Sequence, residues 1–170
     1  MSLEVRDSNI HGKGVFTTEY IPKHSVISRV NVVREVTNEH PLDPVKGELH
    51  HHCHWYPDGT MVLVGKPHCY LNHSCQPNTY FYTVNRISYL MAMRDIWEDE
   101  ELTLEYSLCN FGGLIWDCKC GSPNCLGRHR SGFSHMNRSR QIQYLPYVDP
   151  FIVEAKAELM EEIIDRLLLK

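Results

Sequence analysis

The segment from Asn72 to Asn78 holds the densest group of reactive side chains in the sequence. It reads Asn-His-Ser-Cys-Gln-Pro-Asn and offers an amide, an imidazole, a hydroxyl and a thiol in its first four residues. The Pro-Asn end favours a turn, and apolar runs lie on both sides. Because sites are commonly placed on loops that a rigid scaffold positions, we expect this loop to belong to a functional site.

Three cysteines form a second group with the chemistry of a metal site. Cys118, Cys120 and Cys125 follow a C-x-C-x4-C spacing with a glycine and a proline between them. Thiolates this close around a tight turn suit a tetrahedral zinc ion, and free thiols are the alternative. Since so short a segment has little core of its own, zinc binding and folding should be coupled. The spacing leaves the fourth ligand open among Cys53, Cys69, Cys75, Cys109 and His129.

A third cluster, residues 50–54, contains four histidines and one cysteine. Short tracts of this composition are found at metal sites. However, adjacent residues on a strand point to opposite faces and cannot all converge on one ion. We therefore favour a polar insert that is rich in histidine over a metal site.

Composition limits the class of protein and its compartment. The 170 residues suffice for one domain, and an apolar content of 42% provides a core. The net charge of −4 argues against direct sequence-specific binding of nucleic acid. The odd count of seven cysteines indicates reduced thiols rather than a secreted disulfide scaffold. We find no targeting signal and no long apolar run, so we expect an intracellular protein of a reducing compartment, cytoplasm or nucleus, with no membrane partner.

The elements that must position these groups are mainly short strands. Residues 1–36, 61–64, 79–84, 87–93 and 102–106 are rich in β-branched and aromatic residues and are separated by turns. They predict a mainly β fold with short helices. The acidic run 98–101 is interpreted as a solvated turn, with attraction of a basic peptide as the functional alternative.

Gly12 and Gly14 flank a single residue in the first of these regions. They allow the backbone to approach a ligand closely or to adopt a positive φ, and a plain strand turn is the alternative. A third glycine and a following helix are missing, which excludes the dinucleotide-binding fingerprint.

The C-terminal region is predicted in two parts. Residues 128–147 are basic and aromatic with little periodicity, so we expect a tail that follows the surface, and a linker packed on the domain is the alternative. From Asp149 onward an N-cap aspartate, Pro150 and an apolar stripe at helical period predict one amphipathic helix. The stripe comprises Ile152, Val153, Leu159, Met160, Ile163, Ile164, Leu167 and Leu168. It must be buried, either on its own domain or in a homodimer formed through the helix.

Four motifs, in this order, resemble those of a known family. They are Gly-x-Gly in residues 11–16, N-H-S-C-x-P-N in residues 72–78, E-L-T-[FY]-[DE]-Y in residues 101–106 and C-x-C-x4-C in residues 118–125. Over about residues 4–130 the chain resembles SET-domain protein lysine methyltransferases with a post-SET zinc knuckle. No cysteine-rich pre-SET module precedes the domain, so we expect a minimal form.

The resemblance implies a SET-domain β-fold with a C-terminal pseudoknot, a zinc knuckle and an appended C-terminal helix. The pseudoknot would bring the Asn72 loop against the segment of Tyr106. The resemblance also implies that Cys75 joins Cys118, Cys120 and Cys125 on one structural zinc ion. The expected division is a SET domain in residues 1–112, a post-SET zinc knuckle in 113–130 and a C-terminal tail with the amphipathic helix in 131–170.

The implied reaction is methylation of a lysine side chain in a protein or peptide, with a histone tail as one candidate substrate. The implied methyl donor is S-adenosylmethionine. The donor-binding residues that the resemblance carries over are Lys13, Gly14 and Val15 through their backbone, Asn72, His73, and Trp116 and Leu126 as apolar covers. For Trp116, plain core packing is the alternative.

Tyr106 matches the catalytic tyrosine of the family. A neutral phenol with a pKa of ~10 is a poor base at neutral pH, so we expect its hydroxyl to orient the amine while the proton is lost to water. Leu104 and Tyr70 are also expected in the lysine channel, with Trp55 and Tyr56 as further candidates. Leu104 departs from the usual Phe or Tyr, which leaves the number of transferred methyl groups open. A catalytically inactive SET-like module for peptide or partner recognition is the competing hypothesis.

Overall fold

The computed structural model describes residues 2–56 and 58–168. The strands are β1 Leu3–Asp7, β2 Lys13–Thr17, β3 Val26–Arg29, β4 Val32–Glu35, β5 Cys53–Trp55, β6 Met61–Val64, β7 Asn72–His73, β8 Thr79–Val84, β9 Ile87–Ala92, β10 Glu101–Leu104, β11 Ile115–Asp117 and β12 Arg128–Arg130. The helices are α1 Arg138–Tyr144, α2 Pro150–Ala155 and α3 Ala157–Leu168, and short 3-10 turns join several elements. The prediction of a mainly β fold with short helices is confirmed.

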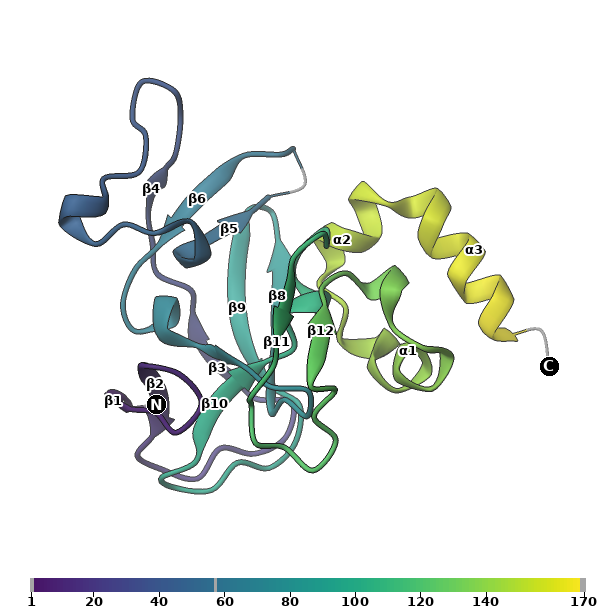
Figure 1. Cartoon of the computed structure of the whole chain (residues 1–170), viewed down its shortest axis with the longest axis horizontal. Coiled ribbons are helices and arrows are strands. Elements are labelled where there is room, and N and C mark those ends of the chain that lie inside the picture. Colours follow the sequence, from purple (N-terminus) through teal and green to yellow (C-terminus); the bar gives the residue numbers. More distant parts are fainter. Residues whose placement is uncertain (1, 57, 169–170) are drawn as a thin grey trace.

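The strands form three sheets, and the helices lie to one side of them (Figure 1). The largest sheet has the order β1-β2-β10-β8-β9-β3, and β7 pairs with β10 off this path. A second sheet has the order β4-β6-β5, and β11 pairs with β12 in a third. The predicted strands at 61–64, 79–84 and 87–93 are present, whereas β5 lies in the insert for which no strand was predicted.

Strand β10 is the element that gathers the motifs. Its first half pairs antiparallel with β2, placing Glu101 opposite Phe16. Its second half pairs parallel with β7, placing Thr103 opposite Asn72 and Leu104 opposite His73. Three stretches far apart in the sequence therefore meet on one strand. The expected approach of the Asn72 loop to the Tyr106 segment is confirmed.

The predicted strand 102–106 is too long at its C-terminal end. β10 stops at Leu104, and Tyr106 begins a 3-10 turn, Tyr106–Leu108. The cause is Glu105, whose carboxylate accepts a hydrogen bond from the backbone N–H of Ser107 and so caps the turn. The turn moves Tyr106 out of the alternation of the strand.

The prediction of a surface-following tail in residues 128–147 is wrong. Asn137 caps α1 by accepting a hydrogen bond from the backbone N–H of Arg140, and α1 then buries Arg140, Gln141 and Tyr144. The helix is thus packed into the molecule by polar side chains as well as by an aromatic one. An amphipathic pattern of apolar residues could not have indicated it.

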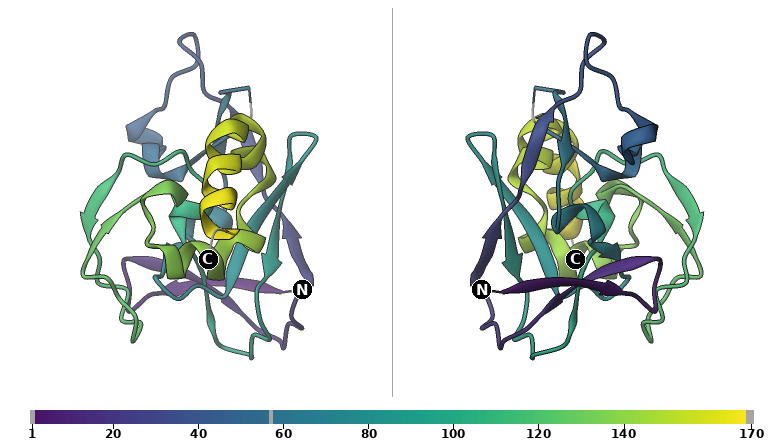
Figure 2. Two further views of the ribbon diagram at one scale, coloured as in Figure 1. Left: turned by 90° about the vertical axis from the view of Figure 1, so that its right-hand side faces the viewer. Right: turned by 90° about the vertical axis from the view of Figure 1, so that its left-hand side faces the viewer.

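The predicted C-terminal helix is present but is divided. Asp149 caps α2 by accepting from the N–H of Phe151, and Pro150 is its first residue, as predicted. The helix ends at Ala155 and α3 follows after Lys156. In the left view of Figure 2, α3 stands in front of the strands.

The helices pack on their own domain. The buried apolar residues on this side include Leu108, Phe151, Ile152, Met160 and Ile163. Three residues of the predicted stripe, Val153, Leu159 and Leu168, are exposed instead. Own-domain packing is therefore observed, and a homodimer stays a prediction. None of the helices in the described part of the chain has the length and apolar character to cross a membrane.

Candidate functional site

Tyr106 lies where the 3-10 turn leaves β10, and its hydroxyl points back to the Asn72 loop. Its Oη donates a hydrogen bond to the backbone carbonyl of Leu71 at 2.9 Å. Burial raises the pKa of the Tyr106 phenol, and the thiol of Cys109 raises it further. The hydroxyl is therefore neutral at physiological pH and acts as a hydrogen-bond donor.

Asn72 organises the Gly-x-Gly loop. Its amide nitrogen lies 2.9 Å from the carbonyl oxygen of Lys13, 2.8 Å from Oε1 of Glu101 and 3.1 Å from Oγ of Ser8. A Cβ atom on Gly14 would lie only 2.3 Å from Oε1 of Glu101, so any other residue at this position would force the Glu101 carboxylate to move. The close approach of the backbone that the Gly-x-Gly motif permits is therefore made here to the Glu101 side chain. The Val15 side chain is fully buried in the core, and Lys13 pairs with an exposed aspartate.

His73 connects the Tyr106 segment to the cysteine cluster. Its Nδ1 accepts from the backbone N–H of Tyr106 at 3.5 Å, and its Nε2 lies 3.5 Å from Sγ of Cys75. Nδ1 as acceptor leaves the proton on Nε2, which then donates to the sulfur. Burial lowers the pKa of His73 to about 4, so the ring is neutral. The ring also contacts those of Trp116, at 5.1 Å, and His129, at 4.4 Å.

Trp116 and Leu126 differ in their environment. Trp116 lies on β11 opposite His129 of β12, and it is half-buried against the rings of His73 and His129. Leu126 is 46% exposed beside the cysteine cluster. Trp116 thus has packing partners of its own, whereas Leu126 leaves an apolar side chain open to a ligand.

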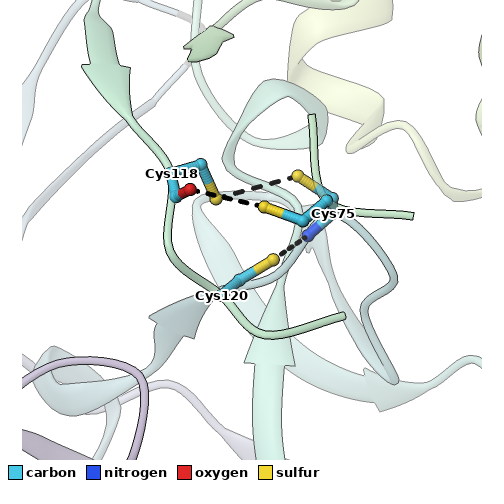
Figure 3. A group of neighbouring side chains, drawn as sticks. Cys75, Cys118 and Cys120 are labelled. Atoms are coloured by element: carbon cyan, nitrogen blue, oxygen red, sulfur yellow. Dashed lines mark hydrogen bonds between the residues drawn. The ribbon is translucent and has the colours of Figure 1, made fainter. Parts of the chain in front are cut away.

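Four cysteines, the set that the resemblance implies, lie together. The sulfur atoms of Cys75, Cys118, Cys120 and Cys125 all lie within 4.8 Å of one another. Three of these side chains point toward a common centre in Figure 3. Cys75 and Cys118 are 3.8 Å apart, which is the ~3.8 Å edge of a tetrahedron with zinc–sulfur bonds of ~2.3 Å. The donor set is chemically suited to zinc.

The electrostatics of the cysteine cluster also favour a cation. Burial raises the pKa of the Cys75 thiol to about 11, so this thiol ionises at neutral pH only where a positive charge offsets its burial. The backbone N–H of Cys75 lies 3.4 Å from Sγ of Cys120 and can stabilise a thiolate there.

A cavity of about 470 Å³ opens on the other side of Tyr106. Leu71, Leu104 and Tyr106 line it, together with residues 50–55 and 109–112. None of the described residues in its lining is Asp, Glu, Lys or Arg. The cavity therefore suits a long, mainly apolar side chain better than a charged group.

The other channel candidates fall on different sides of this cavity. Trp55 lies in the lining. Tyr70 lies beside it, with its ring 6.1 Å from that of His52, and is outside the lining that the described residues form. Tyr56 lies under the guanidinium of Arg86 and borders a separate hollow.

The histidine-rich insert supplies part of the cavity wall. The ring of His50 faces Trp55, and that of His51 faces His52, so these side chains spread along the wall. His54 is buried, and its Nε2 has no hydrogen-bond partner among the described residues. Burial lowers the pKa of His54 to about 4, so its ring is neutral. The alternation of β5 explains why His54 points inward, and the sequence reading missed this strand.

A buried carboxylate next to Tyr106 was also missed. Glu105 is 1% exposed, and its oxygens lie 2.6 Å from the Arg140 guanidinium and 3.0 Å from Nε2 of His129. The Asn137 cap was a sequence signal for a helix at this place. No local signal could have paired Arg140 with a residue 35 positions earlier.

Comparisons with known proteins agree with this architecture. The family model of the SET domain matches residues 12–107, more than half of the chain. The histone-lysine N-methyltransferase ash1 of Drosophila melanogaster is 32% identical over 124 residues, which cover 68% of this chain and 5% of that protein. The human histone-lysine N-methyltransferase described as H3 lysine-36 specific is 44% identical over 63 residues, or 34% of this chain and 2% of that protein.

A solved structure supports the fold. The crystal structure of KRYPTONITE in complex with mCHG DNA and SAH has a TM-score of 0.54 and 24% identity, covering 74% of this chain and 28% of that one. The chain spans only small parts of the two histone-lysine methyltransferases, 5% and 2% of their lengths. What it shares with them is one domain, and the matched residues contain the first three of the four motifs. The chain belongs to the SET domain family.

Proposed function

We propose that the chain transfers methyl groups from S-adenosylmethionine to a lysine side chain of a protein. The observation that carries this proposal is the position of Tyr106. Its neutral hydroxyl lies in the lining of a cavity without Asp, Glu, Lys or Arg among the described residues, and it donates to the carbonyl of Leu71, one residue before Asn72. The cavity for an aliphatic chain thus ends at the Tyr106 hydroxyl. This hydroxyl lies next to the loop that the family uses to bind its methyl donor.

The residues proposed to hold the donor fit that task. The loop of Lys13, Gly14 and Val15 approaches Glu101 so closely that a side chain at position 14 would displace the Glu101 carboxylate, and Asn72 donates a hydrogen bond to the Lys13 carbonyl of the loop. His73 follows Asn72 in the chain. Trp116 and Leu126 are the apolar side chains proposed to cover the donor on the knuckle side. When bound, S-adenosylmethionine supplies a sulfonium methyl group that an amine nitrogen can displace.

The cavity can prepare the lysine for attack. Its lining disfavours a charged ammonium group because desolvation lowers the pKa of a buried amine. Only the neutral amine has the lone pair that attacks. None of the described lining residues is a carboxylate, and the Tyr106 phenol has a raised pKa, so neither serves as the base. Tyr106 orients the amine, and the proton leaves to water.

We infer one structural zinc ion held by Cys75, Cys118, Cys120 and Cys125. The grouping of four sulfur atoms and the tetrahedral separation of two of them support this assignment. Since Cys75 belongs to the loop that carries Asn72 and His73, the ion would tie the knuckle to the active-site loop.

The substrate is proposed to be a lysine-containing protein segment, and a histone tail is the first candidate because the matched relatives are histone-lysine methyltransferases. The acidic run gives little further support. Asp99 pairs with Arg6, Glu100 pairs with Arg94, and Glu101 accepts from Ser8, so most of these carboxylates serve the fold. Reduced buried thiols and the histone relatives support an intracellular location.

Mass spectrometry tests the proposed function. The purified protein is incubated with S-adenosylmethionine and core histones, and with a lysine-rich peptide beside a matched peptide that carries arginine in place of lysine. We expect mass gains of one, two or three methyl groups on lysine only. No gain on any lysine, in a protein whose thermal stability also stays unchanged when the donor is added, would favour the inactive binding module instead.

A further inference from the structure

Arg140 links the segment after the matched SET domain to two residues on the knuckle side of Tyr106, Glu105 and Cys75. One guanidinium nitrogen donates to Oε2 of Glu105 at 2.6 Å, and another donates to the backbone carbonyl of Cys75 at 2.9 Å. Glu105 directly precedes Tyr106, and Cys75 belongs to the cysteine cluster. Arg140 itself is only 8% exposed, so this contact is made inside the molecule.

The carboxylate that Arg140 meets has no access to water. Glu105 is 1% exposed, and its other oxygen accepts from the backbone N–H of Ser107 and lies 3.0 Å from Nε2 of His129. A buried charge that loses its main counter-charge is strongly destabilised. Without Arg140, the Glu105 side chain must therefore move or take up a proton, and the turn that holds Tyr106 begins at Glu105.

The helix that carries Arg140 is held firmly in place. Tyr144, one turn later, also donates to the Cys75 carbonyl at 3.3 Å. Gln141 donates to the carbonyl of Phe133 and accepts from Arg166 of α3 at 2.9 Å. Hydrogen bonds therefore connect α3 through α1 to Glu105 and Cys75, which lie beside the Tyr106 turn.

We propose that Arg140 is a positioning residue for the methyl transfer: it holds Glu105 and the Cys75 carbonyl in one fork and thereby sets the Tyr106 turn. This inference rests on the proposed function for its kinetic consequence. It means that residues after the SET match complete the active site. A planar guanidinium can span both acceptors, whereas a lysine ammonium is a point charge on a flexible stem and cannot keep the same geometry.

The test compares Arg140→Met and Arg140→Lys with two controls. Gln143→Met changes an exposed residue of the same helix, and Ile163→Ala weakens the packing of α3 without touching Glu105 or Cys75. The measurements are kcat, KM for donor and peptide, and hydrogen exchange of the segment 104–109. Exchange is followed at a temperature at which every variant is folded.

We expect Arg140→Met to lower kcat by about tenfold to 100-fold, with KM values within about threefold, because positioning errors act on the chemical step. Arg140→Lys should recover part of this loss. Exchange of segment 104–109 should accelerate more in Arg140→Met than in Ile163→Ala, whose buried cluster includes Leu108, and remain as in the wild type in Gln143→Met.

Two results would overturn the inference. One is a kcat for Arg140→Met no lower than that of Ile163→Ala. The other is unchanged exchange of segment 104–109 in Arg140→Met. The exchange measurement needs no substrate. If the wild type methylates nothing, the proposed function fails, but the exchange comparison still decides whether Arg140 holds the Tyr106 turn.

Discussion

The two sides of the Tyr106 turn differ in the types of side chain that form them. On the knuckle side lie four thiols, two imidazoles and the buried ion pair of Glu105 with Arg140. On the cavity side lie Leu71, Leu104, three separate cysteines and a wall of aromatic and histidine side chains, without Asp, Glu, Lys or Arg among the described lining. Charges and thiols fix the turn from one side, and the other side leaves room for a substrate.

Each side is anchored by a buried carboxylate, and the two anchors differ. Burial pushes the pKa of Glu105 upward, but the hydrogen bonds from His129 and from the backbone N–H of Ser107 bring it below its usual value. Among the described residues, Asp149 accepts only from neutral donors, the N–H and hydroxyl of Thr83 and the N–H of Phe151, and burial raises its pKa to about 6. Asp149 caps α2 and so holds Phe151 in its place behind the cavity wall.

Removal of the proposed zinc should give the largest effect, because it acts on the rigid side. Structural zinc in small peptides is worth ~10–16 kcal/mol of apparent binding free energy at pH 7. A chelator, or Cys120→Ser, should unfold the knuckle, lower Tm sharply and abolish methyl transfer, as followed by calorimetry and metal analysis. Cys53→Ser, outside the cluster, is the matched control. A metal-free protein with unchanged Tm would refute the assignment.

The second prediction concerns the anchor of the cavity side. The pKa of Asp149 has an ordinary value of 3.8 and rises to about 6 in the folded state. The folded state therefore binds the Asp149 proton more tightly than the unfolded chain does. Stability from this group is therefore lost as pH rises from about 4 to about 6, by up to about 3 kcal/mol. Relative to the wild type, Asp149→Asn should gain this amount across that window in denaturant unfolding curves. A constant difference at all pH values would contradict the role of Asp149.

Leu104→Phe should give the smallest effect on stability and a clear effect on the product. The larger ring would fill part of the cavity, with an overpacking cost of about 1–3 kcal/mol. We expect the distribution of products to shift toward fewer methyl groups per lysine, as measured by mass spectrometry of a single peptide. Leu104→Met, similar in volume, serves as the control. An unchanged distribution would show that the cavity side does not limit the product.

The sequence predicted some features of the knuckle side and missed others. The spacing of Cys118, Cys120 and Cys125 indicated a metal site, but only the family resemblance named Cys75, because spacing carries no information on a ligand more than 40 residues away. Arg140 escaped prediction for the same reason. Its partner is distant in sequence, and a buried polar contact leaves no periodic pattern.

The other differences have local causes. The turn at Tyr106 depends on one side-chain cap by Glu105, which competes with strand continuation and does not alter the apolar pattern. The apolar stripe after Asp149 has no member between Val153 and Leu159, and this gap coincides with the division of the helix at Lys156. The strand β5 lies in a histidine-rich insert. The composition of this insert predicted a polar segment, although His54 is buried.

The central claim is that the Tyr106 hydroxyl, held from the knuckle side, directs methyl transfer to an amine in the cavity. The most direct measurement is the single-turnover rate of Tyr106→Phe beside that of the wild type, at saturating donor and peptide. Loss of one positioned donor predicts a fall of ~10²–10³-fold. Loss of the bond to the Leu71 carbonyl should lower the free energy of unfolding by only ~1–3 kcal/mol. Equal rates in the two proteins would contradict the claim.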